Sequence, residues 1–239
     1  MSYFLSPQKL VIGRPVFISG EEFSHITFSR RMKSGDKIEL QDEDGHRCIV
    51  KVDKITKSEL VVLPLEIIEG PEEPECEISL VVALPKPKYI AGIVESGTVL
   101  GAKKVLFFGT SHSPVSKSAF NIERLTRVAS ESAKQCGRAK IPEIEFLDSE
   151  DAALRVASAA SHSFLLDRAG SIFPDLNPPP TSIAILIGPE GGFDTQFLQK
   201  TENLKNLTKI SLGPRILKTE AATHTSLSII GSHYGDIHP

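Results

Sequence analysis

The feature that most constrains the fold is a regular alternation, from about residue 73 onward, of short apolar runs with helical periodicities. The apolar runs have about strand length and are bounded by Gly, Pro or polar residues; they are Ile78–Leu84, Val105–Phe108, Phe164–Asp167, Ile183–Ile187 and Ile210–Leu212. Between them, apolar residues recur at helical spacing. Such alternation predicts an α/β fold with a mainly parallel sheet covered by helices.

Helix starts can be placed from the capping residues. Asn121, Ser149 and Asp194 each precede a segment with helical periodicity, and their side chains suit the N-cap position. Ile90 to Leu100 form another apolar stripe, which Gly101 is expected to end, and Thr219–Ile230 predicts a last helix.

The first part of the chain has a different hydrophobic pattern. Lys37–Gln41 and Arg47–Val52 are short alternating runs on either side of an Asp-Gly pair, Asp44-Gly45, which predicts a hairpin. The segment Glu69–Glu75, rich in Pro and Glu, is typical of a linker. We therefore expect a small β-rich domain, such as a barrel, over residues 1–72 and an α/β domain over residues 73–239.

Composition excludes several classes of protein. The 239 residues carry a formal charge of −3, so any affinity for nucleic acid has to come from local basic patches. No apolar run approaches the roughly 18 residues that a membrane span needs, and the N-terminus lacks the features of a signal peptide. The three scattered cysteines form neither a disulfide framework nor a zinc site, so we expect a soluble cytoplasmic protein with no metal.

Two expected strands near the C-terminus end in Gly-Pro. Ile187 is followed by Gly188-Pro189-Glu190-Gly191-Gly192, and Leu212 is followed by Gly213-Pro214 and then a basic stretch that ends in Thr219-Glu220. In open α/β sheets, ligands bind beyond the carboxyl ends of strands, and glycines let the backbone approach a ligand closely. Each turn taken alone could equally be a plain strand-to-helix connection.

Together, these two segments resemble the last two signature blocks of the bacterial RsmE family, the 16S ribosomal RNA (uracil-N3)-methyltransferases of the SPOUT superfamily. Ala133–Arg138 with the following Ile141-Pro142 resembles the family's "A-x-Q-x-x-R…P" helix, and His25, Arg31 and Gly35-Asp36 resemble the "H…R…GD" block of its N-terminal PUA-like barrel. The resemblance covers nearly the whole chain in the right order.

This resemblance implies a C-terminal trefoil-knotted SPOUT domain after a PUA-like domain, and a homodimer. It also implies that S-adenosylmethionine binds in the knot and that the substrate is uracil N3 of 16S ribosomal RNA in the small ribosomal subunit. The implied cofactor-binding residues are Leu165, Gly188, Pro189, Glu190, Gly191, Leu212, Gly213, Ile216 and Leu217.

Methylation of uracil N3 requires removal of a proton from the base, so a cation or a general base is needed. Arg138 is our candidate for stabilising negative charge on the uracil oxygens, and Glu190 for orienting the base or accepting the proton. The alternatives are a solvated helix end for Arg138 and a helix-start carboxylate for Glu190. We expect contacts with RNA from basic residues in both domains, namely Arg30, Arg31, Lys33, Arg127, Arg138 and Arg215.

The chain departs from the family pattern at a few positions. Ser96 and Val99 stand where the family has Lys and Glu, and Lys218 stands where it has Arg. These changes leave two alternatives open beside the leading function: a SPOUT methyltransferase acting on another RNA, or a non-catalytic RNA-binding assembly protein.

Overall fold

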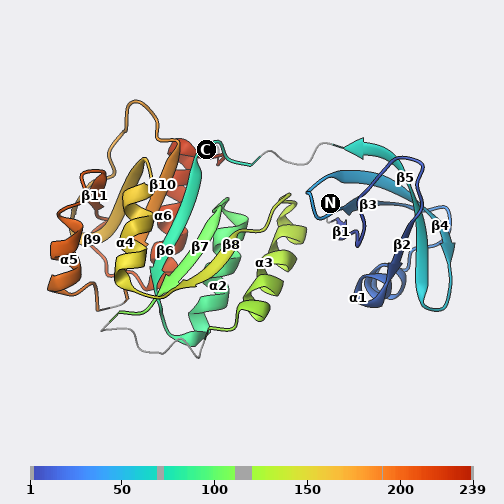
Figure 1. Ribbon diagram of the computed structural model, residues 1–239, viewed down its shortest axis with the longest axis horizontal. Coiled ribbons are helices and arrows are strands. Elements are labelled where there is room, and N and C mark those ends of the chain that lie inside the picture. The colour runs from blue at the N-terminus through green and yellow to red at the C-terminus, as the bar shows by residue number, and fades with distance from the viewer. Residues whose placement is uncertain (1–2, 69–72, 111–119, 190, 238–239) are drawn as a thin grey trace. The chain divides into compact units, whose positions relative to one another are not determined.

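The computed structural model describes residues 3–68, 73–110, 120–189 and 191–237 of the chain (Figure 1). The chain divides into two compact units. The first comprises Met1–Glu72 together with Ala133–Lys140, and the second comprises Glu73–Ser132 and Ile141–Pro239. Part of the expected linker, residues 69–72, lies outside the described residues. No described helix has the length and apolar character needed to cross a membrane.

The first unit is built on a five-stranded sheet with the strand order β1-β3-β4-β5-β2. Its elements are β1 (Phe4–Leu5), β2 (Val16–Ser19), α1 (Gly20–Ser24), the π-helical turn η1 (His25–Ser29), β3 (Lys37–Gln41), β4 (Arg47–Ile55) and β5 (Glu59–Ile68). Register shifts between β4 and β5 mark bulges, which bend the paired strands. The expected β-rich character is confirmed, and Ile18, Leu40 and Leu60 are fully buried in its core.

The predicted hairpin joins β3 to β4. Asp42 accepts the backbone amides of Asp44 and His46 through Oδ1, and Gly45 takes φ +86°, which favours glycine. The Asp42 carboxylate therefore organises the turn.

The second unit is a six-stranded parallel sheet with the order β11-β9-β10-β6-β7-β8. Its strands are β6 (Glu77–Ala83), β7 (Lys104–Phe108), β8 (Glu143–Leu147), β9 (His162–Ser171), β10 (Ser182–Ile187) and β11 (Leu207–Ile210). Its helices are α2 (Pro87–Val99), α3 (Ile122–Cys136), α4 (Glu150–Ala159), α5 (Thr195–Thr201) and α6 (Thr219–Tyr234). The α/β class and the parallel sheet expected from the alternation are confirmed.

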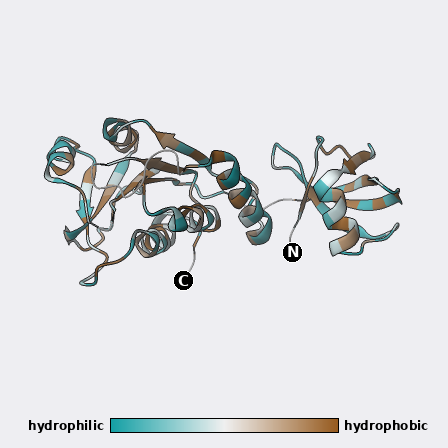
Figure 2. Ribbon diagram, turned by 90° about the horizontal axis from the view of Figure 1, so that it is seen from below, coloured by the Kyte–Doolittle hydropathy of each residue, from teal (hydrophilic) through white to brown (hydrophobic). Residues whose placement is uncertain are grey.

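Helices cover both faces of this sheet. Leu80 and Val82 of β6 pack with α2, α3 and α6, whereas the intervening Val81 packs with α4 and α5, because neighbouring side chains of a strand point to opposite faces. In Figure 2 the helices of this unit carry both colours, and its strands carry brown stretches together with some teal ones. Near-continuous apolar strands are typical of a sheet buried on both faces.

The predicted N-caps lie where expected. Ser149 accepts the amide of Ala152, Asp194 accepts that of Phe197, and Asn121 accepts that of Arg124. One boundary prediction is wrong: the last strand is Leu207–Ile210, not Ile210–Leu212. Leu212 therefore belongs to the loop that follows the strand, where it lies beside the site described next.

Candidate functional site

A cavity of about 420 Å³ opens at the carboxyl ends of β9, β10 and β11, which are neighbours in the sheet. Three segments surround it: residues 166–168 within β9, the loop after β10 and the loop after β11. The lining residues are Leu166, Asp167, Arg168, Ile187, Gly188, Pro189, Gly191, Gly192, Phe193, Leu198, Ile210, Ser211, Leu212, Gly213, Arg215, Ile216, Leu217 and Ala222. This is the position at which open α/β sheets bind ligands.

The loop after β10 lines the cavity mainly with backbone atoms, because several of its residues are glycines. A Cβ atom on Gly188 would lie 3.2 Å from the ring of Phe193, so a larger residue would have to displace that ring by a few tenths of an ångström. The Phe193 ring is itself held by stacking on Phe197, with 4.3 Å between centroids, and Phe197 is fully buried. The cavity thus gains a fixed apolar wall.

Two close approaches connect the elements around the cavity. A Cβ atom on Gly170 would lie only 2.5 Å from the backbone of Ile210, so the end of β9 packs directly on the end of β11. Thr219, at the start of α6, donates its hydroxyl to the carbonyl oxygen of Gly188 at 3.3 Å and is almost fully buried. This bond connects the loop after β10 to the helix that follows the loop after β11.

Most of the residues expected to bind a cofactor line this cavity, and they are Gly188, Pro189, Gly191, Leu212, Gly213, Ile216 and Leu217. Leu165 does not line it. This residue is fully buried against α4 and α5, and its neighbour Leu166 lines the cavity instead because side chains alternate along β9. Glu190 lies outside the described residues.

Arg215, expected to contact RNA, also lines the cavity, and sequence reasoning missed two other charged lining residues, Asp167 and Arg168. Asp167 Oδ1 accepts the amide of Ala169 in the part of β9 where its pairing with β11 is irregular. Both residues directly follow the apolar residues of β9 in the sequence. Polar or glycine residues directly after an apolar run are also what indicated the two Gly-Pro segments.

Arg138 lies in the segment Ala133–Lys140, which groups with the first unit. Three side chains of that unit bind consecutive carbonyl oxygens of the segment. Tyr3 donates its hydroxyl to Arg138 O at 2.8 Å, the Gln41 amide donates to Ala139 O at 2.5 Å, and Arg47 donates to Gly137 O.

The three side chains that hold this segment also contact one another. The Arg47 guanidinium lies 4.2 Å from the centroid of the Tyr3 ring and donates to Gln41 Oε1. Burial raises the pKa of the Tyr3 hydroxyl, which therefore stays protonated and able to donate. Arg138 itself is only 9% exposed, so it is not a solvated helix end.

The remaining basic residues that are expected to contact RNA have exposed side chains. Arg127 lies on α3, whereas Arg30, Arg31 and Lys33 follow the η1 turn in the first unit. Arg31 has φ +55°, a left-handed conformation that is unusual for a residue other than glycine.

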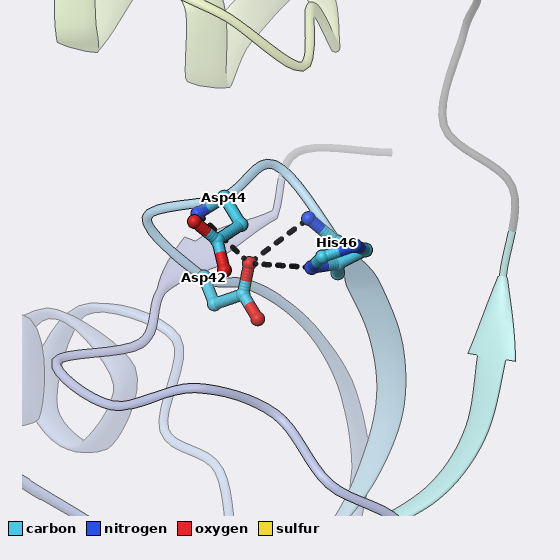
Figure 3. A group of neighbouring side chains, drawn as sticks. All are labelled: Asp42, Asp44 and His46. Atoms are coloured by element: carbon cyan, nitrogen blue, oxygen red, sulfur yellow. Dashed lines mark hydrogen bonds and ion pairs between the residues drawn. The ribbon is translucent and has the colours of Figure 1, made fainter.

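A cluster of Asp42, Asp44 and His46 brings three possible metal-ligand atoms within 4.8 Å of one another (Figure 3). The Asp42 oxygens are already engaged, because Oδ1 accepts the two amides of the hairpin turn and Oδ2 accepts the amide of Leu10. Asp44 forms a 2.7 Å ion pair with Lys9. We interpret the cluster as the framework of a turn.

Two family models match the chain. The model described as "RNA methyltransferase domain" matches residues 71–231, and the one described as "RNA methyltransferase PUA domain" matches residues 18–65. The chain is similar to curated proteins called ribosomal RNA small subunit methyltransferase E. The Bacillus subtilis protein is 29% identical, with 95% of this chain and 94% of that protein covered; the Rickettsia conorii protein is 27% identical, with 87% and 86% covered.

Solved structures share the fold over almost the full length. A methyltransferase of Legionella pneumophila, solved in complex with the bound cofactor SAM, is 26% identical with a TM-score of 0.85, and 98% of each chain is covered. A ribosomal RNA small subunit methyltransferase E of Neisseria gonorrhoeae, bound to S-adenosyl methionine, is 19% identical with a TM-score of 0.87 over the whole of both chains.

Proposed function

Because the chain belongs to the RNA methyltransferase domain family, whose model covers residues 71–231, we propose that it transfers the methyl group of S-adenosylmethionine to uracil N3 in 16S ribosomal RNA of the small ribosomal subunit. The observation that carries this proposal is the cavity formed by residues 166–168 of β9 and the loops after β10 and β11. The names of the curated relatives supply the substrate.

The cavity suits the proposed cofactor in size and in chemistry. Its volume of about 420 Å³ lies within the roughly 300–1,000 Å³ that is usual for small-molecule sites. Phe193, Leu212 and Leu217 offer apolar surface to an adenine ring, and the loop glycines expose backbone donors and acceptors. When bound, the cofactor would supply a methyl group on a positively charged sulfur.

The chain's own residues would position the base and remove its proton. Methylation of uracil N3 would replace the N3 proton, so that proton has to be accepted by another group. We assign acceptance of that proton to Glu190 and stabilisation of the negative charge on the uracil oxygens to Arg138. The buried backbone contacts of Tyr3, Gln41 and Arg47 support this role for Arg138, since a charge-stabilising group must be held in place.

We further propose that the loops form a trefoil knot and that two copies form a homodimer in the cytoplasm. The support for the knot is that the two Gly-Pro segments, which resemble signature blocks of the family, line the same cavity. Chromatography with light scattering tests the dimer through the measured mass.

The departures at Ser96 and Val99 do not favour the non-catalytic alternative. Neither residue lines the cavity. Ser96 is buried between α2 and α6, where its Oγ lies 2.7 Å from His224 Nε2 and bonds to Gly92 O, so it has a packing role at this position.

The test is a transfer of labelled methyl groups from S-adenosylmethionine by the purified protein. Small ribosomal subunits from cells that lack the gene are compared with protein-free 16S ribosomal RNA and with transfer RNA. We expect labelling of 16S RNA only, and its loss in Arg138→Ala and Glu190→Gln. Labelling of transfer RNA alone would assign a different RNA substrate, and cofactor binding without any transfer would support an assembly protein.

A further inference from the structure

Phe28 presents an aromatic ring to solvent in the first unit. Its side chain is 70% exposed, and it lies in the π-helical turn η1, an element that often marks a functional site. The edge of the ring contacts the buried Phe23, with 6.0 Å between centroids and 85° between ring planes. A single exposed apolar residue is common on protein surfaces. Whether this ring has a role in binding therefore depends on the residues around it.

Those surroundings are basic. From Phe28 to Lys37 the sequence holds four cationic side chains, Arg30, Arg31, Lys33 and Lys37, and one acidic side chain, Asp36, within a chain of net charge −3. Backbone bonds hold this segment against the η1 turn, since Arg30 N donates to His25 O and Met32 N donates to Ile26 O. The cations therefore follow the exposed ring directly in the sequence, on a backbone that is bonded to the η1 turn.

Three acidic groups lie near this segment. Glu22 is paired with Lys134 at 3.1 Å, and the carboxylate of Asp36 accepts the backbone amide of Lys33. Glu21 lines the same shallow hollow as Phe28. An exposed aromatic ring followed by clustered cations is the pattern by which proteins hold single-stranded nucleic acid, with bases on the ring and phosphates on the cations.

We propose that Phe28 is a stacking platform for an unpaired RNA base, and that Arg30, Arg31 and Lys33 contact the phosphates beside that base. The proposal rests on the proposed function, because it assigns part of the RNA contact to the first unit. RNA fits this surface better than an apolar protein face does, since a single ring among cations offers little apolar area and a strong attraction for phosphates.

Substitution of the ring gives the first test, with a short oligouridine as the probe. We expect Phe28→Ala to raise the Kd for oligouridine about 5- to 150-fold, the range expected for loss of one base stack. The same variant should raise the KM for small ribosomal subunits and leave kcat unchanged. The matched control is Phe17→Ala, which removes a 46% exposed ring from β2 of the same unit and should change neither constant.

Fluorescence gives the second test, because the chain contains no tryptophan. In Phe28→Trp, the only indole should be quenched by oligouridine through stacking and much less by double-stranded RNA, whose base faces are covered. Phe17→Trp should show no quenching by either RNA. These readouts measure binding and are separate from methyl transfer, so they remain decisive if the proposed activity fails.

Two results would overturn the proposal. One is an unchanged Kd for oligouridine in Phe28→Ala. The other is a raised KM for subunits with an unchanged Kd for oligouridine, which would indicate that Phe28 contacts a ribosomal protein and not RNA.

Discussion

The hydroxyl of Thr219 donates a hydrogen bond to the carbonyl oxygen of Gly188 across 3.3 Å, and this bond joins the start of α6 to the loop after β10. The two residues are 31 positions apart in the sequence, and each belongs to one of the two Gly-Pro segments. The bond therefore fixes two walls of the proposed cofactor cavity relative to each other.

Thr219→Val should weaken cofactor binding. Valine keeps the shape of the side chain but removes the donor, which costs about 1 kcal/mol and so about a fivefold rise in Kd. Calorimetric titration with S-adenosylmethionine measures the effect. Thr223→Val is the control, because the Thr223 hydroxyl bonds within α6, to Thr219 O, and the residue does not line the cavity. Equal losses of affinity in both variants would refute a specific role for the bond.

Gly213→Val should abolish measurable cofactor binding. Gly213 has φ +110°, which a residue with a Cβ atom adopts only with strain, and it lines the cavity, so valine also adds bulk there. Gly13→Val gives the comparison, since Gly13 has φ +77°, lies in the first unit and has open space around it. It should lose stability but retain affinity. Unchanged affinity in Gly213→Val would place the cofactor elsewhere.

Tyr3→Phe should loosen the segment that carries Arg138. The variant leaves Arg138 O without its 2.8 Å donor, at a cost of about 1–3 kcal/mol, whereas the ring that contacts Arg47 remains. Hydrogen exchange should become faster at the amides of residues 137–140, and kcat should fall more than the affinity for cofactor. Tyr89→Phe, on α2, serves as the control. Unaltered exchange at those amides would show that the contact does not order the segment.

The three cysteines should differ in reactivity. Burial raises the pKa of the Cys76 thiol to about 11 and also raises that of Cys48, so both are almost fully protonated at pH 8, whereas Cys136 is exposed. Iodoacetamide at pH 8 should modify Cys136 alone in the native protein, as read by peptide mass spectrometry.

The same pKa shift makes folding depend on pH. Unfolded Cys76 loses its proton near its ordinary pKa of about 8.5, whereas the folded thiol keeps it up to about pH 11. The unfolded state then binds fewer protons in this window, so the free energy of unfolding should fall as pH rises from about 8.5 to 11. Cys76→Ala should lessen that slope, and an identical slope would contradict the assignment.

Much of the second unit could be predicted because its signals are local. Ser149 and Asp194 cap helices through their own side chains, and the apolar runs of β6 and β10 are long enough to indicate buried strands. By contrast, β8 was missed because its exposed positions carry Glu143 and Glu145, and its pairing with β7 depends on tertiary contacts.

The parts of the site that escaped prediction depend on contacts distant in sequence. One face of β9 packs against α4 and α5, and the other faces the cavity. The local sequence does not indicate which of Leu165 and Leu166 lies on which face. The contact of Tyr3 with Arg138 spans 135 residues. Such contacts follow from the folded arrangement and leave no periodic signal in the sequence.

The most direct test of the central claim is identification of the methylated nucleoside. Small subunits from cells lacking the gene are treated with the protein and S-adenosylmethionine, and the 16S RNA is digested and analysed by mass spectrometry. The account predicts 3-methyluridine at a single position, absent from the untreated subunits and from those treated with Gly213→Val protein. A methyl group on any other atom or base, or no methylation by a protein that binds the cofactor, would contradict it.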